Sequence, residues 1–348
     1  MTSAGAKGNT LAEMQKILHL PVDAGNIHAG FRTLFAALNG EGISAGKRGY
    51  ELAVANALWG KSGVPWRREF LAVASKNYGA GLIEVDFDRP ESAAKTINDW
   101  VENKTRNRIK NLVTPASFST LTRLVLTNAI YFKGTWDTAF PKEGTKIEPF
   151  HRLDGTKRDA PLMHRFGEFA YTDNDAYEAI DVPYKGKDLA MLVWLPRRPD
   201  AFADFDKKFA GTTIAETVKA LQPGTKVELT LPKYKVTKSY SLKSPLAALG
   251  MKDAFDASDS SRADFSGMHT GREILHIDAV LHRAFIDVTE EGTEAVAATA
   301  VTMGLPTAAP GRNPIEHKVF RADRPFLFAI RHVPSNAVLF LGRVTDLG

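Results

Sequence analysis

The sequence predicts a mixed α+β fold in a single domain that spans residues 1–348. Amphipathic helical stretches and apolar strand-like runs follow one another without the regular strand–helix alternation of a doubly wound sheet. No composition break, internal repeat or low-complexity tail divides the chain. From residue 121 to about 240 the signals are mainly β, with strands separated by Gly, Pro and charged turns.

The composition limits the classes of function that need to be considered. The chain is 44% hydrophobic and 24% charged, as in an ordinary globular protein, and it has no apolar run of about eighteen residues that would form a transmembrane helix. A net charge of +5 does not require a nucleic-acid partner. The absence of cysteine excludes disulfides and thiolate metal sites. We therefore expect neither a nucleic-acid nor a membrane partner.

The first part of the chain alternates between apolar patterns typical of helices and apolar patterns typical of strands. Helices are predicted over 9–20, where Asn9 and Thr10 provide a cap, over 28–39 and over 68–79. Strands are predicted over 51–60 and 81–87. The clearest helix covers 92–113, and its basic cluster at 104–110 is interpreted as a solvated face.

The middle and end of the chain are richer in strands. Residues 121–136 form a long apolar run typical of a strand covered on both faces, and Asn128 is its one strongly polar interior residue. A helix is predicted over 240–255 and a strand over 276–288, where His282 lies among apolar neighbours. The segment 324–344 is predicted to form a hairpin around Pro334, Ser335 and Asn336.

The segment 289–310, TEEGTEAVAATAVTMGLPTAAP, has two opposed interpretations. Its small residues bury little surface, which favours an exposed loop. It also contains no Pro before Pro306, and its Thr and Val favour extended backbone. As a strand it would place on one face the small and mostly apolar series Thr293, Ala295, Ala297, Thr299, Val301 and Met303.

The sequence lacks the common motifs of catalytic, nucleotide-binding and metal-binding sites. The sequence has no G-x-S-x-G elbow, P-loop, dinucleotide fingerprint or H-E-x-x-H, and the nine His residues show no metal-ligand spacing. We expect a protein that is not an enzyme and that has no cofactor, no catalytic residue and no metal site.

Taken together, several segments resemble the serpins, the serine protease inhibitor family, over essentially the whole chain. In the family's order they are SAGAKGNTLAEM, ELAVANALW, IEVDF, INDWVENKT, LVLTNAIYFKGTW, DVPYKGKDLAMLVWLP, LPKYKV, LGMKDAF, ADFSGM, HRAFIDVTEEGTEAVAATA and RPFLFAIRHVPSNAVLFLGRV. The resemblance implies a serpin fold with three β-sheets, about eight helices and an exposed reactive-centre loop at about 290–318.

The resemblance also implies a mechanism. A serpin loop is attacked by a protease, and the cleaved loop inserts into the central sheet and traps the acyl-enzyme, so that the protein acts as a suicide substrate. The hinge of this loop is Glu290, Glu291, Gly292, Thr293, Glu294, Ala295, Val296, Ala297, Ala298 and Thr299. Its small residues predict an active inhibitor. A non-inhibitory serpin or a simple protease substrate is the alternative.

The resemblance assigns three further residues. Asn128 and His282 match the "shutter", where the large sheet opens, and Trp136 matches the "breach", where insertion begins. Two polar residues on neighbouring apolar strands are expected to form a buried hydrogen bond.

The position of the reactive bond follows from counting about seventeen residues from Glu290, as in the family's inhibitors. This count places the bond at Pro306–Thr307, with Thr307–Ala308 and Leu305 as alternatives. Small residues at this bond predict an elastase-like or subtilisin-like target protease, and a cysteine protease is a further candidate partner. Arg312–Asn313 lies too far along the loop for an efficient trap.

The chain departs from the family pattern at its beginning. Serpins have a helix, a strand and most of a second helix before the residues matched by Met1, including shutter serines that would contact His282. The alternative, a non-inhibitory serpin or protease substrate, would follow if the loss of these elements disables inhibition. No signal peptide is visible, although the family favours an extracellular or periplasmic location, and we expect a monomer.

Overall fold

The protein is described by a computed structural model that covers residues 1–21, 24–39, 49–79, 81–258, 262–271, 274–293 and 316–347. Its residues cluster into two compact units. Unit 1 comprises Met1–Gly42, Leu52–Tyr131 and Thr237–Phe285, and unit 2 comprises Ile43–Glu51, Phe132–Val236 and Ile286–Gly348. Four strands, β1, β3, β9 and β10, have residues in both units.

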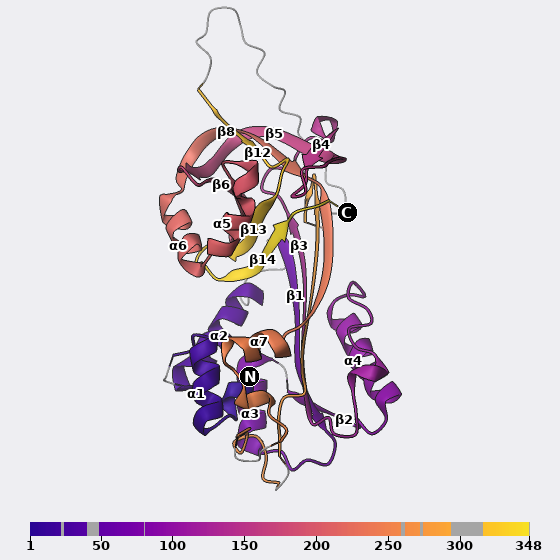
Figure 1. Ribbon diagram of the computed structural model, residues 1–348. Helices are drawn as coiled ribbons and strands as arrows, with labels where there is room; N and C mark the ends of the chain where they lie inside the picture. Colours follow the sequence, from indigo (N-terminus) through magenta and orange to yellow (C-terminus); the bar gives the residue numbers. More distant parts are fainter. Residues whose placement is uncertain are drawn as a thin grey trace, which may run out of the picture. The chain divides into compact units, whose positions relative to one another are not determined.

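In unit 1, helices cover both faces of the strands (Figure 1). The helices α1 (Gly8–Ile17), α2 (Ala24–Asn39), α3 (Arg68–Tyr78) and α7 (Lys243–Leu249) lie on one face, and α4 (Pro90–Lys104) lies on the other. A separate apolar cluster fills each side. Ile97 and Val101 of α4 pack with Trp59 and Val125, whereas Met14 of α1 packs with Leu58 and Leu124. Because both faces are covered, the strands can be apolar throughout.

The first sheet has six strands: β1 (Tyr50–Lys61), β2 (Leu82–Val85), β3 (Leu124–Thr135), β9 (Tyr234–Ser241), β10 (Ala279–Thr289) and β11 (Gly292–Thr293). Their order is β2-β1-β3-β11-β10-β9. Strands β3 and β10 also pair directly and in parallel, from Ala279↔Val125 to Phe285↔Tyr131.

The second sheet has eight strands: β4 (Lys146–His151), β5 (Lys157–Asp173), β6 (Tyr177–Pro183), β7 (Leu189–Pro196), β8 (Gln222–Pro232), β12 (Lys318–Arg321), β13 (Phe326–His332) and β14 (Val338–Val344). The order is β12-β8-β5-β6-β7-β13-β14, with β4 paired to β5. Helices α5 (Phe202–Lys208) and α6 (Gly211–Ala220) cover part of it, where Trp194 packs against Phe202 and Phe209.

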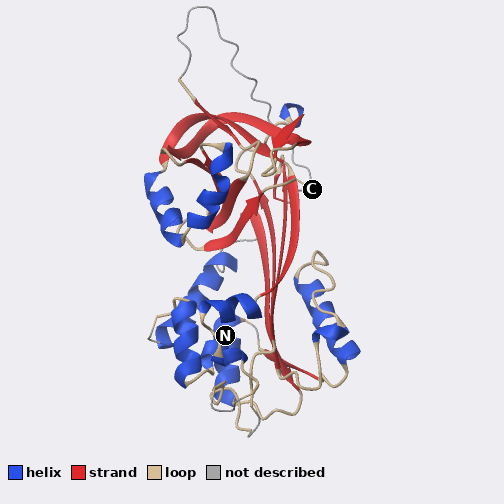
Figure 2. Cartoon of the chain, viewed as in Figure 1, coloured by secondary structure: helices blue, strands red, loops and turns tan. Residues whose placement is uncertain are grey.

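The mixed α+β prediction is confirmed: long strands and separate groups of helices are both prominent (Figure 2). The described residues form seven α-helices and the short 3-10 turns Thr2–Ala4, Pro115–Ser117, Lys142–Gly144, Pro199–Ala201 and Asp253–Phe255. Hydrogen bonding connects their strands into two sheets rather than three, because the long strand β5 pairs with β4, β6 and β8. Among these helices none has the length and apolarity needed to cross a membrane.

Two predicted helices end earlier than expected. The helix predicted over 92–113 ends at Lys104, because Thr105 bonds Val101 O through its side chain and Arg106 and Asn107 adopt left-handed backbone. The helix predicted over 240–255 is interrupted after Leu249 by Gly250, which has φ of 119°. Asn9 and Thr10 do not cap α1, which begins at Gly8. Thr10 instead donates to Arg262 O at 2.7 Å.

Candidate functional site

The sequence predicts that the segment after β10 is the hinge of a loop, and the structure describes the first part of it, in unit 2. The chain turns through Glu290 and Glu291 and returns as β11. β11 pairs antiparallel with β10 (Thr289↔Gly292) and with β3 (Gly292↔Thr135). The beginning of the predicted loop therefore already lies as a short strand between β3 and β10.

Gly292 is required by this geometry. Its φ is 147°, which favours glycine, and a Cβ at this position would lie 2.0 Å from Gly134 O. A larger residue would push β11 away from β3.

Two ion pairs hold the turn. Glu290 is 7% exposed, lies 2.9 Å from the Lys233 ammonium and accepts a hydrogen bond from Thr145 Oγ1 at 2.8 Å. Glu291 pairs with Lys142 at 2.7 Å. Burial raises the pKa of Glu290, but hydrogen bonds from Lys233 and Thr145 outweigh burial and hold it below its usual value. The turn thus begins with a carboxylate that stays ionised although it is buried.

Trp136, the predicted breach residue, fastens β3 to this turn. Its indole Nε1 donates to Thr289 O at 3.0 Å, and its backbone N donates to Glu291 O at 2.9 Å. Its ring stacks on Tyr184 with centroids 4.5 Å apart. The Tyr184 hydroxyl is 2.8 Å from the hydroxyl of Thr293, which is completely buried. Trp136 and Tyr184 therefore hold the hinge residues Glu291 and Thr293 in place.

The predicted shutter residues lie directly opposite each other in unit 1, where His282 of β10 is in register with Asn128 of β3. His282 Nδ1 lies 2.5 Å from Asn128 Oδ1 and must carry the proton, because the amide oxygen only accepts. The Asn128 amide donates in turn to Asn56 Oδ1 on β1. A hydrogen-bond chain thus crosses three neighbouring strands.

His282 is half-buried. Its ring stacks on Tyr240 of β9, with centroids 5.9 Å apart and planes at 19°. Burial lowers its pKa below the usual histidine value. The neutral ring is therefore favoured.

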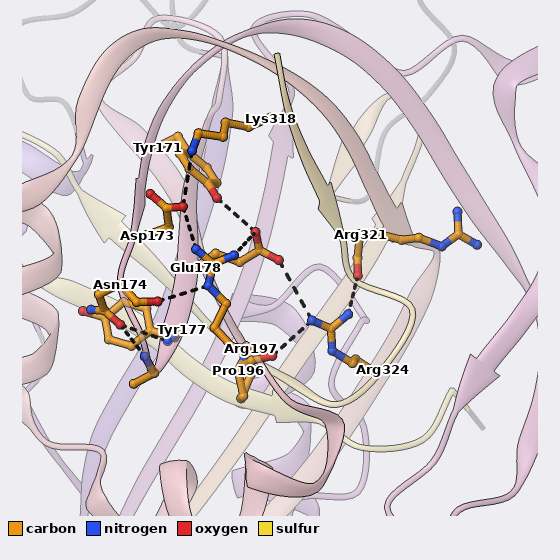
Figure 3. Close-up of polar contacts among 11 residues, drawn as sticks. Tyr171, Asp173, Asn174, Tyr177, Glu178, Pro196, Arg197, Lys318, Arg321 and Arg324 are labelled. Carbon is orange, nitrogen blue, oxygen red and sulfur yellow. Dashed lines mark hydrogen bonds and ion pairs between the residues drawn. The ribbon is translucent and has the colours of Figure 1, made fainter. Parts of the chain in front are cut away.

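The predicted loop ends at β12, the edge strand of the second sheet, where ion pairs connect Lys318 to neighbouring strands (Figure 3). Lys318 lies 3.4 Å from Asp173, which also binds Arg197 at 2.6 Å. Arg197 and Arg324 both approach the buried Glu178, at 3.9 and 4.0 Å. Burial raises the pKa of Glu178, although Tyr171 donates a hydrogen bond to it at 3.0 Å.

The predicted reactive-bond residues Leu305, Pro306, Thr307 and Ala308 and the hinge residues Glu294 to Thr299 lie outside the described residues. Their assignments remain predictions. No cluster of three potential metal ligands occurs in the described ranges.

Sequence reasoning missed several residues of the site. Asn56 is the one polar residue in an otherwise apolar run, 52–59, which is the same signal that identified Asn128. Lys233, Lys142 and Tyr184 carry no such signal, because their role depends on which strands become neighbours.

Comparisons with known proteins agree with this architecture. The family model described as "Serpin (serine protease inhibitor)" matches residues 1–347. An uncharacterized serpin-like protein of Thermococcus kodakarensis is 40% identical, with 99% of this chain and 77% of that protein covered. The leukocyte elastase inhibitor of Bos taurus is 39% identical over 99% of this chain and 89% of its own.

Comparison with solved structures also shows similarity to serpins. The crystal structure of Serpin48 of the insect Tenebrio molitor superimposes with a TM-score of 0.84 and 30% identity, and covers all of this chain and 88% of that one. Protease inhibition in general is the family's activity. The chain belongs to the serpin family.

Proposed function

We propose that the protein is a suicide-substrate inhibitor of serine proteases and not an enzyme. The observation that carries this proposal is the position of β11 between β3 and β10. A loop that starts as a strand inside a sheet can lengthen that strand once its far end is cut.

The register of β11 predicts where an inserted loop would lie. Gly292 pairs with Thr135 and Thr293 with Gly134, so each residue further along the loop would pair with the preceding residue of β3. Continuation of the same antiparallel ladder places Thr299 opposite Asn128. The direct β3–β10 pairing would have to open, including the pair His282↔Asn128. The shutter bond would therefore break before the loop could pass.

Insertion is expected to stabilise the protein strongly. About ten new backbone hydrogen bonds at roughly 0.5–1.5 kcal/mol net each give about 5–15 kcal/mol. Such a gain is comparable with the whole stability of a typical fold, about 5–15 kcal/mol. The uncleaved protein is accordingly metastable.

The target is proposed to be an elastase-like or subtilisin-like serine protease. Small residues around the predicted bond Pro306–Thr307, with Thr307–Ala308 and Leu305 as alternatives, support this choice. The leukocyte elastase inhibitors among the relatives point the same way. A cysteine protease is the second class to test.

We treat the chain as one functional domain and as a monomer. The proposed insertion uses β3 and β10, which both have residues in each compact unit, so neither unit could act alone.

The test is incubation of the protein with pancreatic elastase, subtilisin and trypsin, followed by denaturing electrophoresis and mass spectrometry. We expect an SDS-stable complex with elastase or subtilisin, and a released C-terminal peptide that begins at Thr307. Clean cleavage without a complex by each of these proteases would contradict the proposal.

A further inference from the structure

A cavity of about 420 Å³ opens on the surface of unit 1, lined by the chain before α1, the beginning of α3 and the loop that precedes β10. Its lining residues come from the three segments 4–7, 67–73 and 266–267. The volume lies within the range of small-molecule sites, about 300–1,000 Å³. We call this hollow the α3 cavity.

Backbone hydrogen bonds fix the three segments that line the α3 cavity. Arg67 N donates to Met268 O at 2.7 Å, and Gly267 N donates to Gly5 O at 3.0 Å. The segments approach so closely at the two glycines that a Cβ on Gly267 would lie 2.7 Å from Gly5 O. Arg67 Nε also donates to Ser266 O at 2.8 Å. The cavity is therefore formed before any ligand binds, which lowers the entropic cost of binding.

Part of the lining is apolar. Phe70 of α3 is 3% exposed and belongs to the apolar cluster on this side of the first sheet, and Ala4 packs against the same cluster. Half-buried Val73, about one turn further along α3, also lines the cavity. An apolar side chain of a ligand would be removed from water against these three residues.

Three charged side chains complete the lining: Lys7, Arg67 and Glu69. Among the residues that the structure describes, the side chains of Lys7 and Glu69 have no hydrogen-bond or ion-pair partner. Arg67 uses only Nε within the protein, to bind Ser266 O and His269 O. Two cations and one carboxylate therefore surround an apolar surface, with their charges available to a ligand.

We propose that the α3 cavity binds a small zwitterion with an apolar side chain, of which an apolar α-amino acid is the simplest example. Lys7 and the outer nitrogens of Arg67 would hold the carboxylate, because charge-assisted hydrogen bonds to a carboxylate are strong. Glu69 would hold the ammonium group, and the ligand side chain would lie against Phe70 and Val73. The site belongs to unit 1 and does not depend on the proposed inhibition of proteases.

The first test uses the full wild-type chain and three related probes. Ligand-observed saturation-transfer NMR measures the dissociation constants of L-phenylalanine, of 3-phenylpropanoate, which lacks the ammonium group, and of phenethylamine, which lacks the carboxylate. We expect each of the two analogues to bind about threefold more weakly than L-phenylalanine, the order expected for loss of an exposed charge pair.

The second test locates the binding with Lys7→Gln and Glu69→Gln. Both variants should bind L-phenylalanine about threefold more weakly than wild type. Lys76→Gln is the matched control, because Lys76 is an exposed cation in the last turn of the same helix and does not line the cavity. It should bind like wild type. Glu69→Gln should also bind 3-phenylpropanoate at least as well as wild type does, because the repulsion between two carboxylates is removed.

Two results would overturn the inference. The first is the absence of L-phenylalanine binding, or binding that Lys7→Gln and Glu69→Gln leave unchanged. The second is equal binding of L-phenylalanine and 3-phenylpropanoate by wild type, since the ammonium group would then not be recognised. Melting temperatures verify that the variants fold. The comparison of the three probes needs no variant, so it decides the question even if a substitution disturbs folding.

Discussion

Single polar side chains connect β10 to its neighbouring strands and hold the turn after it, and their energetics can be stated residue by residue. The chain His282–Asn128–Asn56 lies between β-strands whose other side chains are mostly apolar. All three side chains are half-buried, so a member that loses its partner costs about 1 kcal/mol, the low end of the range for a buried polar group. Each member of the chain therefore depends on the next.

Asn56→Ala is expected to lower the free energy of unfolding by about 1 kcal/mol, because the half-buried Asn128 amide loses its acceptor. Urea denaturation monitored by circular dichroism measures this change. Asn103→Ala, on the exposed end of α4, is the control and should change stability by less than about 0.5 kcal/mol. Equal effects of both substitutions would show that the hydrogen bond between Asn56 and Asn128 does not stabilise the protein.

The lowered pKa of His282 predicts a pH dependence. The unfolded chain binds the proton more tightly than the folded one, so stability is intact above the ordinary value of 6.5 and falls as the pH drops below it towards the lower folded pKa. His282→Gln should lose less stability between pH 7 and pH 5 than wild type. His28 and His332 also have lowered pKa values and contribute equally to both proteins. If the stabilities of wild type and His282→Gln fall in parallel between pH 7 and pH 5, the titration of His282 does not contribute to the pH dependence.

Glu290 also loses its contribution on acidification, but at a lower pH than His282. Its folded pKa is depressed, so its contribution is present above the ordinary value of 4.5 and is lost as the pH falls through the folded pKa. Glu290→Gln should cost about 1 kcal/mol at pH 7, a small figure because Lys233 is partly exposed. Denaturation of Glu290→Gln beside Glu143→Gln, an exposed neighbour, checks this. No difference at pH 7 would show that the pair contributes nothing.

At the scale of elements, the proposed insertion requires the hinge to enter the sheet with one face inward. Buried Thr293 sets the alternation, so Ala295 is expected to point inward and Val296 outward. Ala295→Arg would place an unpaired charge in the interior, which costs several kcal/mol and should stop insertion. We expect this variant to be cleaved as a substrate.

Val296→Arg is the matched control for Ala295→Arg, because the same charge would face solvent, and it should remain an inhibitor. Electrophoresis of both variants after incubation with elastase and subtilisin gives the ratio of complex to cleaved protein. A stable covalent complex formed by Ala295→Arg would refute the hinge assignment.

The elements also show what the sequence can predict. Lone polar residues in apolar runs identified Asn128 and His282, because such residues need partners wherever the strand lies. Their partners Asn56 and Tyr240 lie 72 and 42 residues away along the chain, and only the strand order brings them together. The end of α4 was missed because left-handed backbone at Arg106 and Asn107 has no periodic signal. Most elements were predictable, whereas the contacts between them were not.

At the scale of the whole molecule, the proposed mechanism requires that the native protein is not in its most stable state. The melting temperature before and after cleavage of the loop tests this most directly. The protein is cut with a protease that forms no complex, and the cut is located by mass spectrometry. Differential scanning calorimetry then compares both forms.

We expect the cleaved form to melt at a much higher temperature, because insertion of the loop between β3 and β10 adds about 5–15 kcal/mol. A cut within 294–308 should also leave the cleaved protein folded as a single cooperative unit. An unchanged or lower melting temperature after such a cut would mean that the loop does not insert, and the proposed inhibitory mechanism would be wrong.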